Sequence, residues 1–418
     1  MQKHVFRIVA GVDIHKKTAV VTVRTHRDGL ADELETRTFE TFRDGLVVMA
    51  RWLEERNVDV VGIESTGVFW IPVLRTIQET AAKLLVWLIN PLHVKSRAPR
   101  GRKTDRQDSI LISELIMYGQ VTPSYVPSWE QNEIRKLTRH RTTLTADQTR
   151  YKNRIIKELE CSGVKLSSVV TDCLGKSGRA IIDALLEGKQ TPAEIAQLAR
   201  GTLRKKIALI TRAVEGAFTP STATVLRQLL KNFDRIAQQI ADLDHQIRQL
   251  MAPHAAELEL VKTIPGIDDV SAAAALAETG PDMSLFPGAH NLTSWAGVSP
   301  GSNESAGKTK KAPTRKGNKF LRTVLVQCSW AAVRANTCHW KATFHKLTAR
   351  LGPKKAIVAI TRKMLTAFYF ILRDRIPFSP PDKLPIPPDV RRRMIRSLTA
   401  KLQALGLEVS LTPAAAVS

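Results

Sequence analysis

Cysteine and long apolar runs are scarce in this chain of 418 residues, and each scarcity argues against a class of protein. The four cysteines lie far apart and form no CxxC pair, which argues against a zinc ribbon and a disulfide framework and fits a reducing cytoplasm. No apolar run approaches the roughly 20 residues of a membrane span, so we expect no membrane partner. Strand-like sequence follows Met1–Phe6 at once, and we therefore expect no signal peptide.

Acidic residues are also few: the chain has 39 Asp or Glu but 63 Lys or Arg, which gives a formal net charge of +24. An excess of this size is typical of proteins that bind a polyanion, and nucleic acid is the commonest polyanion. The alternative is a basic protein whose charges are simply solvated. The length allows two or three domains with a substantial core.

The N-terminal part alternates between apolar runs of strand length and stretches with helical spacing. We expect strands at 8–14, 18–23, 36–39, 58–63 and 84–89, and helices at 46–53 and 68–80. Three hairpin-like strands followed by alternating helices and strands predict a mixed α/β sheet.

Four acidic residues lie at positions where open α/β sheets commonly bind ligands. Asp13 lies at the end of the first predicted strand, Glu64 follows the fourth, and Asp105 and Asp108 share one face of a predicted helix. Sites in open α/β sheets form outside the carboxyl ends of strands, so the first two acids meet if their strands are neighbours. Four converging carboxylates repel one another unless cations lie between them. Two metal ions held in this way are used on phosphodiesters.

Each acid also has a purely structural interpretation. Asp13 binds a neighbouring backbone group or Lys16, and Glu64 caps the helix that follows it. Asp105 caps its own helix, with Asp108 in the first turn where the helix dipole favours acids. The order of the acids along the chain favours the metal site over these separate roles.

The middle of the chain is predominantly helical. Residues 130–160 carry basic side chains that are either solvated or in contact with phosphates, namely Arg135, Lys136, Arg139, Arg141, Arg150, Lys152 and Arg154. From Leu226 to Leu250, apolar residues alternate spacings of three and four, which predicts a coiled-coil seam. We expect an antiparallel hairpin with 130–160 that also joins subunits. The alternatives are pairing with the same helix of another subunit and a plain core helix.

The C-terminal part is strongly basic, since residues 308–375 hold 17 Lys or Arg and a single acid. Such a stretch can follow a phosphate backbone closely. Just before it, Leu260–Ala272 resembles a helix-hairpin-helix whose glycine turn offers backbone N–H groups to a phosphate. We expect nucleic-acid contacts from Lys103, Arg106, Lys262, Lys308, Lys310, Lys311, Arg315, Lys316, Asn318, Lys319 and Arg322.

Residues 323–375 predict two helices, with core candidates Trp330, Trp340, Phe344, Phe368 and Phe370. Pro377–Pro388 predicts a stiff linker, followed by a short basic helix at Arg391–Arg396 that adds non-specific affinity for nucleic acid. We expect Thr412–Ser418 to be disordered.

Several motifs resemble those of the DEDD transposases of insertion-sequence family one-ten: Gly11–Lys16, Ile63–Gly67 and Lys103–Asp108, then Asn303–Lys308 and Arg315–Arg322. The resemblance implies an RNase H-like, RuvC-like N-terminal domain in which Asp13, Glu64, Asp105 and Asp108 form the acidic tetrad. It also implies that Ser305 is the nucleophile, with Ser302 as the nearby alternative. Ser109 stands where the family usually has alanine.

The resemblance extends over roughly residues 8–370 and implies a bacterial or archaeal transposase. We expect a DEDD domain (1–125), a helical coiled-coil region (126–255), a mainly helical serine-containing domain (256–376), and a linker with a basic tail (377–418). The implied activity is Mg²⁺-dependent cleavage and rejoining of donor and target double-stranded DNA through a Ser305–DNA bond. The tetrad is implied to hold two ions.

The implied partners include a non-coding bridge RNA that pairs with both DNAs. Because Ser305 follows Asp108 by almost 200 residues and lies on another predicted domain, and because two duplexes must be bound, we expect a dimer or tetramer whose site combines one subunit's acids with another's serine. The implied location is the cytoplasm, on the nucleoid. One alternative is a metal-dependent junction resolvase or nuclease in which water attacks. The other is a non-catalytic protein that only binds nucleic acid.

Overall fold

The computed structural model describes residues 5–65, 67–91, 94, 104–216, 218–301, 304–305, 308–309, 313–314, 316–335, 338–380 and 388–410. The chain forms two compact units, Met1–Val126 and Pro127–Ser418, and each is described by itself. Within the described residues, none of the helices combines the length and the apolar character needed to cross a lipid bilayer.

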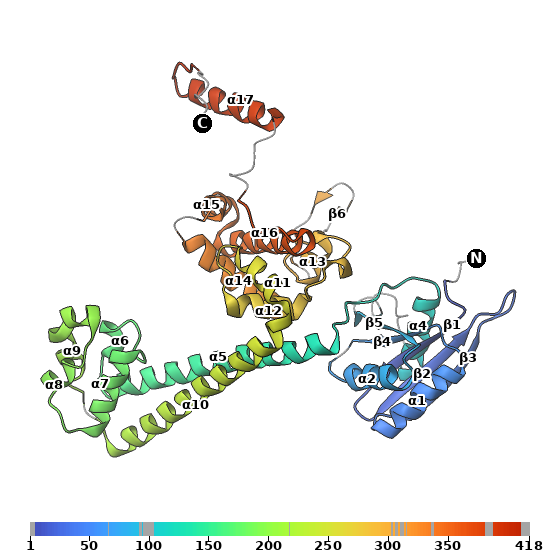
Figure 1. Cartoon of the computed structure of the whole chain (residues 1–418), viewed down its shortest axis with the longest axis horizontal. Coiled ribbons are helices and arrows are strands. Elements are labelled where there is room, and N and C mark those ends of the chain that lie inside the picture. The colour runs from blue at the N-terminus through green and yellow to red at the C-terminus, as the bar shows by residue number, and fades with distance from the viewer. Residues whose placement is uncertain are drawn as a thin grey trace. The chain divides into compact units, whose positions relative to one another are not determined.

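The first unit is built on one five-stranded sheet with the order β3-β2-β1-β4-β5 (Figure 1). Its strands are β1 (Ile8–Ile14), β2 (Thr18–Thr25), β3 (Glu33–Glu40), β4 (Val60–Glu64) and β5 (Leu85–Ile89). β2 runs antiparallel to both β1 and β3, whereas β1, β4 and β5 are parallel. The predicted mixed sheet is confirmed. β3 is longer than predicted because all of its residues pair with β2.

Helices cover both faces of this sheet: α1 (Arg43–Glu55), α2 (Trp70–Thr80) and α4 (Asp105–Met117). Side chains alternate between the two faces of a strand. Ala10 and Val12 pack with α1 and α2, whereas Val9 and Val60 pack with α4. The odd-numbered residues of β1 and the even-numbered residues of β4 therefore face α4.

A glycine lets α4 lie close against β1. A Cβ atom on Gly11 would lie 2.1 Å from the carbonyl oxygen of Ser109 and 2.5 Å from the backbone nitrogen of Ser113. Ser109 is fully buried at this contact, and its hydroxyl lies 2.7 Å from that of Thr22 on β2. The start of α4 is thus fixed over the middle of the sheet.

The second unit begins with a long helical hairpin. The helices α5 (Trp129–Cys161) and α10 (Pro220–Met251) lie side by side and antiparallel (Figure 1), as predicted. Leu226, Ile236 and Ile247 are buried along the predicted seam. Leu250 is 43% exposed and Met251 is buried instead, so the seam ends differently from the prediction. That the hairpin also joins subunits stays a prediction.

Short helices connect the far ends of this hairpin and share a small apolar core around Ile181 and Ile210. They are α6 (Leu166–Val169), α7 (Lys176–Glu187), α8 (Pro192–Ala196) and α9 (Ile207–Ala213).

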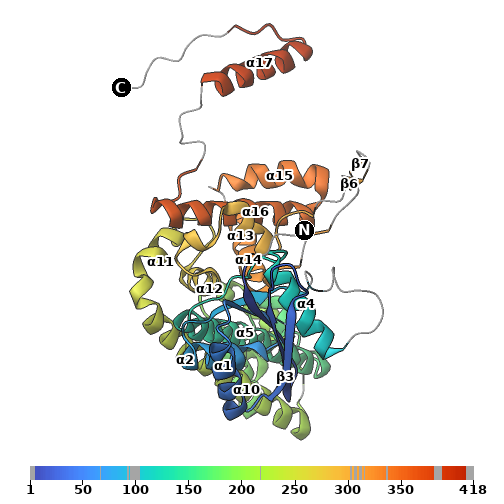
Figure 2. The same ribbon diagram turned by 90° about the vertical axis from the view of Figure 1, so that its right-hand side faces the viewer.

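The remaining helices pack into a second bundle, in which α15 lies along α16 (Figure 2). They are α11 (Ala255–Lys262), α12 (Asp269–Thr279), α13 (Ala289–Trp295), α14 (Lys319–Arg334), α15 (Trp340–Leu351) and α16 (Pro353–Asp374). Two strands, β6 (Glu304–Ser305) and β7 (Lys308–Thr309), precede α14, and α17 (Pro388–Ala404) follows the bundle. Most of the predicted linker and all of Thr412–Ser418 lie outside the described residues.

The prediction of two helices over 323–375 is wrong, since three helices occupy that region. Gly352, with φ of +75°, ends α15, and Pro353 starts α16 at a position where proline is favoured. Trp340, Phe344 and Phe368 are buried as predicted. Phe370 is instead 41% exposed, with the Arg373 guanidinium 4.6 Å from the centre of its ring.

Candidate catalytic site

The strands that carry the first two acids are neighbours, as the predicted site requires. Val12 of β1 pairs with Ile63 of β4 in parallel register, so Asp13 and Glu64 follow one residue later at the same edge. Both belong to the alternating set of residues that faces α4. The carboxyl ends of two parallel strands thus bring two acids of distant sequence together.

The helix α4 adds the other two acids from above the sheet. Its cap is Thr104, whose hydroxyl accepts the N–H of Gln107 at 3.3 Å, and not Asp105 as the structural alternative proposed. Asp105 and Asp108 both lie in the first turn, where the positive end of the helix dipole stabilises negative charge. Glu64 does not cap the next helix either, because α2 starts after Phe69 without a side-chain cap.

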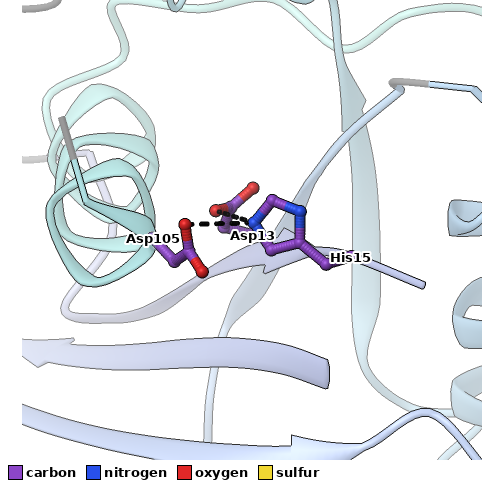
Figure 3. A group of neighbouring side chains, drawn as sticks. All are labelled: Asp13, His15 and Asp105. Atoms are coloured by element: carbon purple, nitrogen blue, oxygen red, sulfur yellow. Dashed lines mark ion pairs between the residues drawn. The ribbon is translucent and has the colours of Figure 1, made fainter. Parts of the chain in front are cut away.

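A histidine joins two of the acids. His15 Nε2 lies 3.3 Å from Asp13 Oδ2 and 3.1 Å from Asp105 Oδ1 (Figure 3). One ligand atom from each of these residues lies within 4.8 Å of the others, a spacing that one metal ion could span. The sequence suggested Lys16 as a partner of Asp13, and the contact with His15 was not predicted. The available signal was its position two residues after Asp13, on the same side of an extended chain.

Asp13 is the electrostatic centre of the group. It is 8% exposed, and its Oδ2 accepts no hydrogen bond. Burial raises the pKa of Asp13; nearby His15 acts in the opposite direction, and the charges of Asp108, Asp105 and Glu64 raise the pKa further. The other three predicted acids therefore all lie close enough to Asp13 to act on its charge. A buried carboxylate oxygen that accepts no hydrogen bond, and whose neighbours are the His15 ring and three acids, fits a site for a divalent cation.

The predicted nucleophile lies on a short β-hairpin in the second unit. Glu304 pairs with Thr309 and Ser305 with Lys308 in antiparallel register. Nearer the base, Pro300 bridges to Thr314 and the Gly301 N–H donates to the Pro313 carbonyl at 3.2 Å. We call the described residues of this segment, namely 298–301, 304–305, 308–309, 313–314 and 316, the serine hairpin.

The predicted nucleic-acid contacts have varied surroundings. Arg106, Lys316 and Lys319 are exposed, and Arg322 is half-buried. The Lys262 ammonium lies 2.7 Å from both Glu259 and Asp269, which neutralise it locally. Lys308 is described by its backbone pairing, and Lys103, Lys310, Lys311 and Arg315, like Ser302, lie outside the described residues.

Asn318 requires a correction, because the polar atoms of its side chain bind within the protein. Its Oδ1 accepts the N–H groups of Phe320 and Leu321 and caps α14, and its Nδ2 donates to Glu278 at 2.6 Å. The basic face of α5 also differs from both of its proposed interpretations. Arg135 and Arg139 bind Glu278, and Arg141 binds Asp244.

Comparison with known proteins places these features in a family. An IS110 model of DEDD type described as "Transposase" matches residues 10–162, and the model "Transposase IS116/IS110/IS902 family" matches residues 258–345. Together they cover more than half of the chain and include both the four acids and Ser305. The chain belongs to the IS110 transposase family. This is the family that the sequence motifs resemble, and the chain is a transposase enzyme.

Named relatives of this IS110 transposase come from several bacteria. The chain is 25% identical to the pilin gene-inverting protein of Moraxella lacunata over 391 residues, which is 88% of this chain and 96% of the relative. It is 26% identical to the IS900 uncharacterized 42 kDa protein of Mycobacterium paratuberculosis, over 69% and 76% of the two chains. Thermus thermophilus RuvC aligns with 28% of this chain and 99% of its own, with a TM-score of 0.24 and 14% identity.

Proposed function

We propose that this transposase cuts and rejoins DNA through a covalent bond between Ser305 and a DNA phosphate, with Asp13, Glu64, Asp105 and Asp108 holding Mg²⁺ ions. The observation that supports the metal site is the buried Asp13 Oδ2, which accepts no hydrogen bond, pairs with the His15 ring at 3.3 Å and lies near three further acids. An all-carboxylate set suits Mg²⁺, and the size of the set suits two ions. When bound, such ions polarise the phosphate and stabilise charge on the attacking and leaving oxygens.

The proposed role of Ser305 is nucleophilic attack by its hydroxyl oxygen on phosphorus. The Ser305 Oγ–P bond forms, one P–O bond to a deoxyribose breaks, and the serine proton ends on the released deoxyribose oxygen. A deoxyribose hydroxyl of the other DNA then attacks the same phosphorus and restores the serine hydroxyl. The number of phosphodiester bonds is conserved, so rejoining needs no added energy source.

Rejoining is favoured over simple cleavage by the name of two relatives, the pilin gene-inverting proteins of Moraxella lacunata and Moraxella bovis. Inverting a gene requires that cut ends be joined again in the opposite order. We further propose donor and target duplexes as substrates, a bridge RNA that selects them, and a dimer or tetramer with a composite site. The domain limits at residues 125, 255 and 376, and action on the nucleoid in the cytoplasm, belong to the same proposal.

The test is a recombination assay with purified protein, donor DNA, target DNA and the transcript that flanks the gene, with and without Mg²⁺. Ser305→Ala should abolish the covalent protein–DNA product on a denaturing gel, whereas Ser302→Ala, three residues away, should retain it. If Ser305→Ala still cuts DNA, a resolvase-like nuclease is the better hypothesis. If Asp105→Ala changes neither cleavage nor recombination, the metal site is wrong.

A further inference from the structure

A buried carboxylate in α12 binds two arginines of α5 and the residue that caps α14. Glu278 is 2% exposed, and five donor contacts converge on it. Arg135 donates Nε and Nη2 to Oε2 at 3.1 and 2.8 Å. Arg139 donates Nε to Oε1 at 2.7 Å and Nη2 to Oε2 at 2.8 Å. Asn318 Nδ2 donates to Oε2 at 2.6 Å.

The charge of Glu278 is stabilised by these partners. Burial alone would raise the pKa of Glu278, but the hydrogen bond from Arg139 and the charges of Arg135 and Arg139 outweigh it and lower the pKa. The carboxylate is therefore ionised at neutral pH. Buried ion pairs contribute little net stability compared with apolar packing, yet they define geometry closely because each partner must be satisfied.

One partner of Glu278 forms the base of the serine hairpin. The Asn318 N–H donates to the Trp295 carbonyl at 3.0 Å, and its side chain caps α14. The preceding Gly317 lies so close to the other end of the hairpin that a Cβ atom would be 2.3 Å from the Gly297 nitrogen. Both ends of the serine hairpin are therefore held together where Asn318 contacts Glu278.

The other partners lie on the first turns of α5. Gln131, Arg135 and Arg139 are four residues apart and share one face of that helix. Gln131 Nε2 donates to the Ala277 carbonyl at 2.9 Å, next to Glu278. This helix begins three residues after Val126, where the unit that carries the acids ends. Glu278 thus joins the base of the serine hairpin to the helix that follows the acid-bearing unit in the chain.

We infer that Glu278 is a positioning residue for the nucleophile: it fixes the base of the serine hairpin onto α5 and so sets the direction from which Ser305 attacks. The inference rests on the proposed function of Ser305. Glu278 itself contacts neither DNA nor the reacting atoms in this role. It acts through Asn318 on one side and through Arg135 and Arg139 on the other.

Glu278→Gln keeps the size of the side chain and removes its charge. We expect at least a tenfold slower formation of the Ser305–DNA product, with the Kd for donor DNA changed less than twofold. Glu257→Gln is the matched control. Glu257 is also a buried carboxylate of this bundle, at 8% exposure. It pairs instead with Arg375, the residue that follows α16. Glu257→Gln should form the Ser305–DNA product at a rate within about twofold of wild type, with folding of both variants checked first.

A second variant tests the same contact if Glu278→Gln does not fold. Asn318→Ser retains a residue that caps helices well but removes the amide that donates to Glu278. It should reproduce the slow product formation, and the double variant Glu278→Gln with Asn318→Ser should be no slower than the slower single variant. Additive effects, or equal rates in Glu278→Gln and Glu257→Gln, would overturn the inference.

Hydrogen exchange provides a readout that does not depend on catalysis. Amides of residues 298–318 should exchange at least tenfold faster in Glu278→Gln and Asn318→Ser than in Glu257→Gln. If Ser305→Ala keeps the covalent product while this exchange pattern holds, the proposed nucleophile is wrong and the positioning of the hairpin stands. Unchanged exchange in Glu278→Gln removes the positioning role itself.

Discussion

Replacing Asp13 with asparagine should stabilise the metal-free protein although it removes a proposed metal ligand. Burial and the neighbouring acids raise the pKa of Asp13 and outweigh the opposite effect of His15, which lies 3.3 Å from Oδ2; this oxygen accepts no hydrogen bond. A carboxyl group whose pKa is higher in the folded state destabilises that state as pH rises through the folded pKa. Removing the charge should therefore increase the free energy of unfolding at neutral pH by about 1 kcal/mol.

The matched control is Asp32, whose side chain is as little exposed to solvent as that of Asp13 but accepts several hydrogen bonds. Its side chain is 10% exposed, compared with 11% for Asp13. Asp32 binds Arg24 Nη1 at 2.9 Å, His26 Nδ1 at 3.0 Å and the Tyr118 hydroxyl at 3.1 Å. Burial opposes its charge, but these bonds lower its pKa. Asp32→Asn should cost about 2–4 kcal/mol at neutral pH, a loss that disappears as pH falls through the folded pKa.

Divalent cations should then separate the two variants. A ligand at one hundred times its Kd stabilises the folded state by about 2.7 kcal/mol. For a unit of this size, that corresponds to a rise in Tm of roughly 5–15 °C. Wild type and Asp32→Asn should show this rise in Mg²⁺ or Mn²⁺ relative to EDTA, and Asp13→Asn should lose most of it. Scanning calorimetry measures both quantities. A destabilised metal-free Asp13→Asn, or one with the full metal response, would refute the reasoning.

Four further variants test the scaffold and the tail. Gly11→Ala places a Cβ atom 2.1 Å from the Ser109 carbonyl and should cost at least about 3 kcal/mol in urea unfolding, whereas Gly29→Ala, in open space with φ of +73°, should cost about 1 kcal/mol. Ser109→Ala should cost under about 1.5 kcal/mol and retain recombination, because Thr22 still bonds Thr36 at 2.9 Å. Deleting residues 388–418 should weaken non-specific DNA binding and flatten its dependence on log salt by about 0.9 per lost phosphate contact, without preventing the covalent product; an unchanged slope would contradict a DNA role for the tail.

The sheet of the first unit could be predicted because its strands are short apolar runs with clear ends. The same alternation that defines β1 and β4 also places Asp13 and Glu64 on one face, so half of the acid cluster followed from local sequence. β3 was underestimated because Glu33–Glu40 is mostly polar and exposed, and its extent is set by pairing with β2. Edge strands of this kind have a weak apolar signal.

Contacts between distant charged residues could not be predicted from local patterns. Arg135 and Arg139 occupy a polar helix and look like solvated or phosphate-binding residues until Glu278, about 140 positions later, is packed against them. Asn318 was misassigned for the same reason. It lies in a run of basic residues that indicates DNA binding, yet its position before α14 makes it a helix cap. Charge density predicts a partner, whereas only tertiary packing tells which charges the fold uses itself.

These internal pairs change where DNA attraction is expected. Three arginines of α5 are paired with Glu278 and Asp244 inside the protein. The strongest excess of positive charge therefore lies in residues 308–375, which hold a net +16 of the total +24. The acid cluster, in contrast, repels phosphates until cations are bound. Capture of DNA should therefore depend on salt and not on divalent metal, whereas product formation should require the metal. We expect the Kd for donor DNA in EDTA to lie within about threefold of the Kd in Mg²⁺ at matched ionic strength. A Kd that weakens by more than tenfold in EDTA would instead make the acid cluster a principal part of the DNA-binding surface.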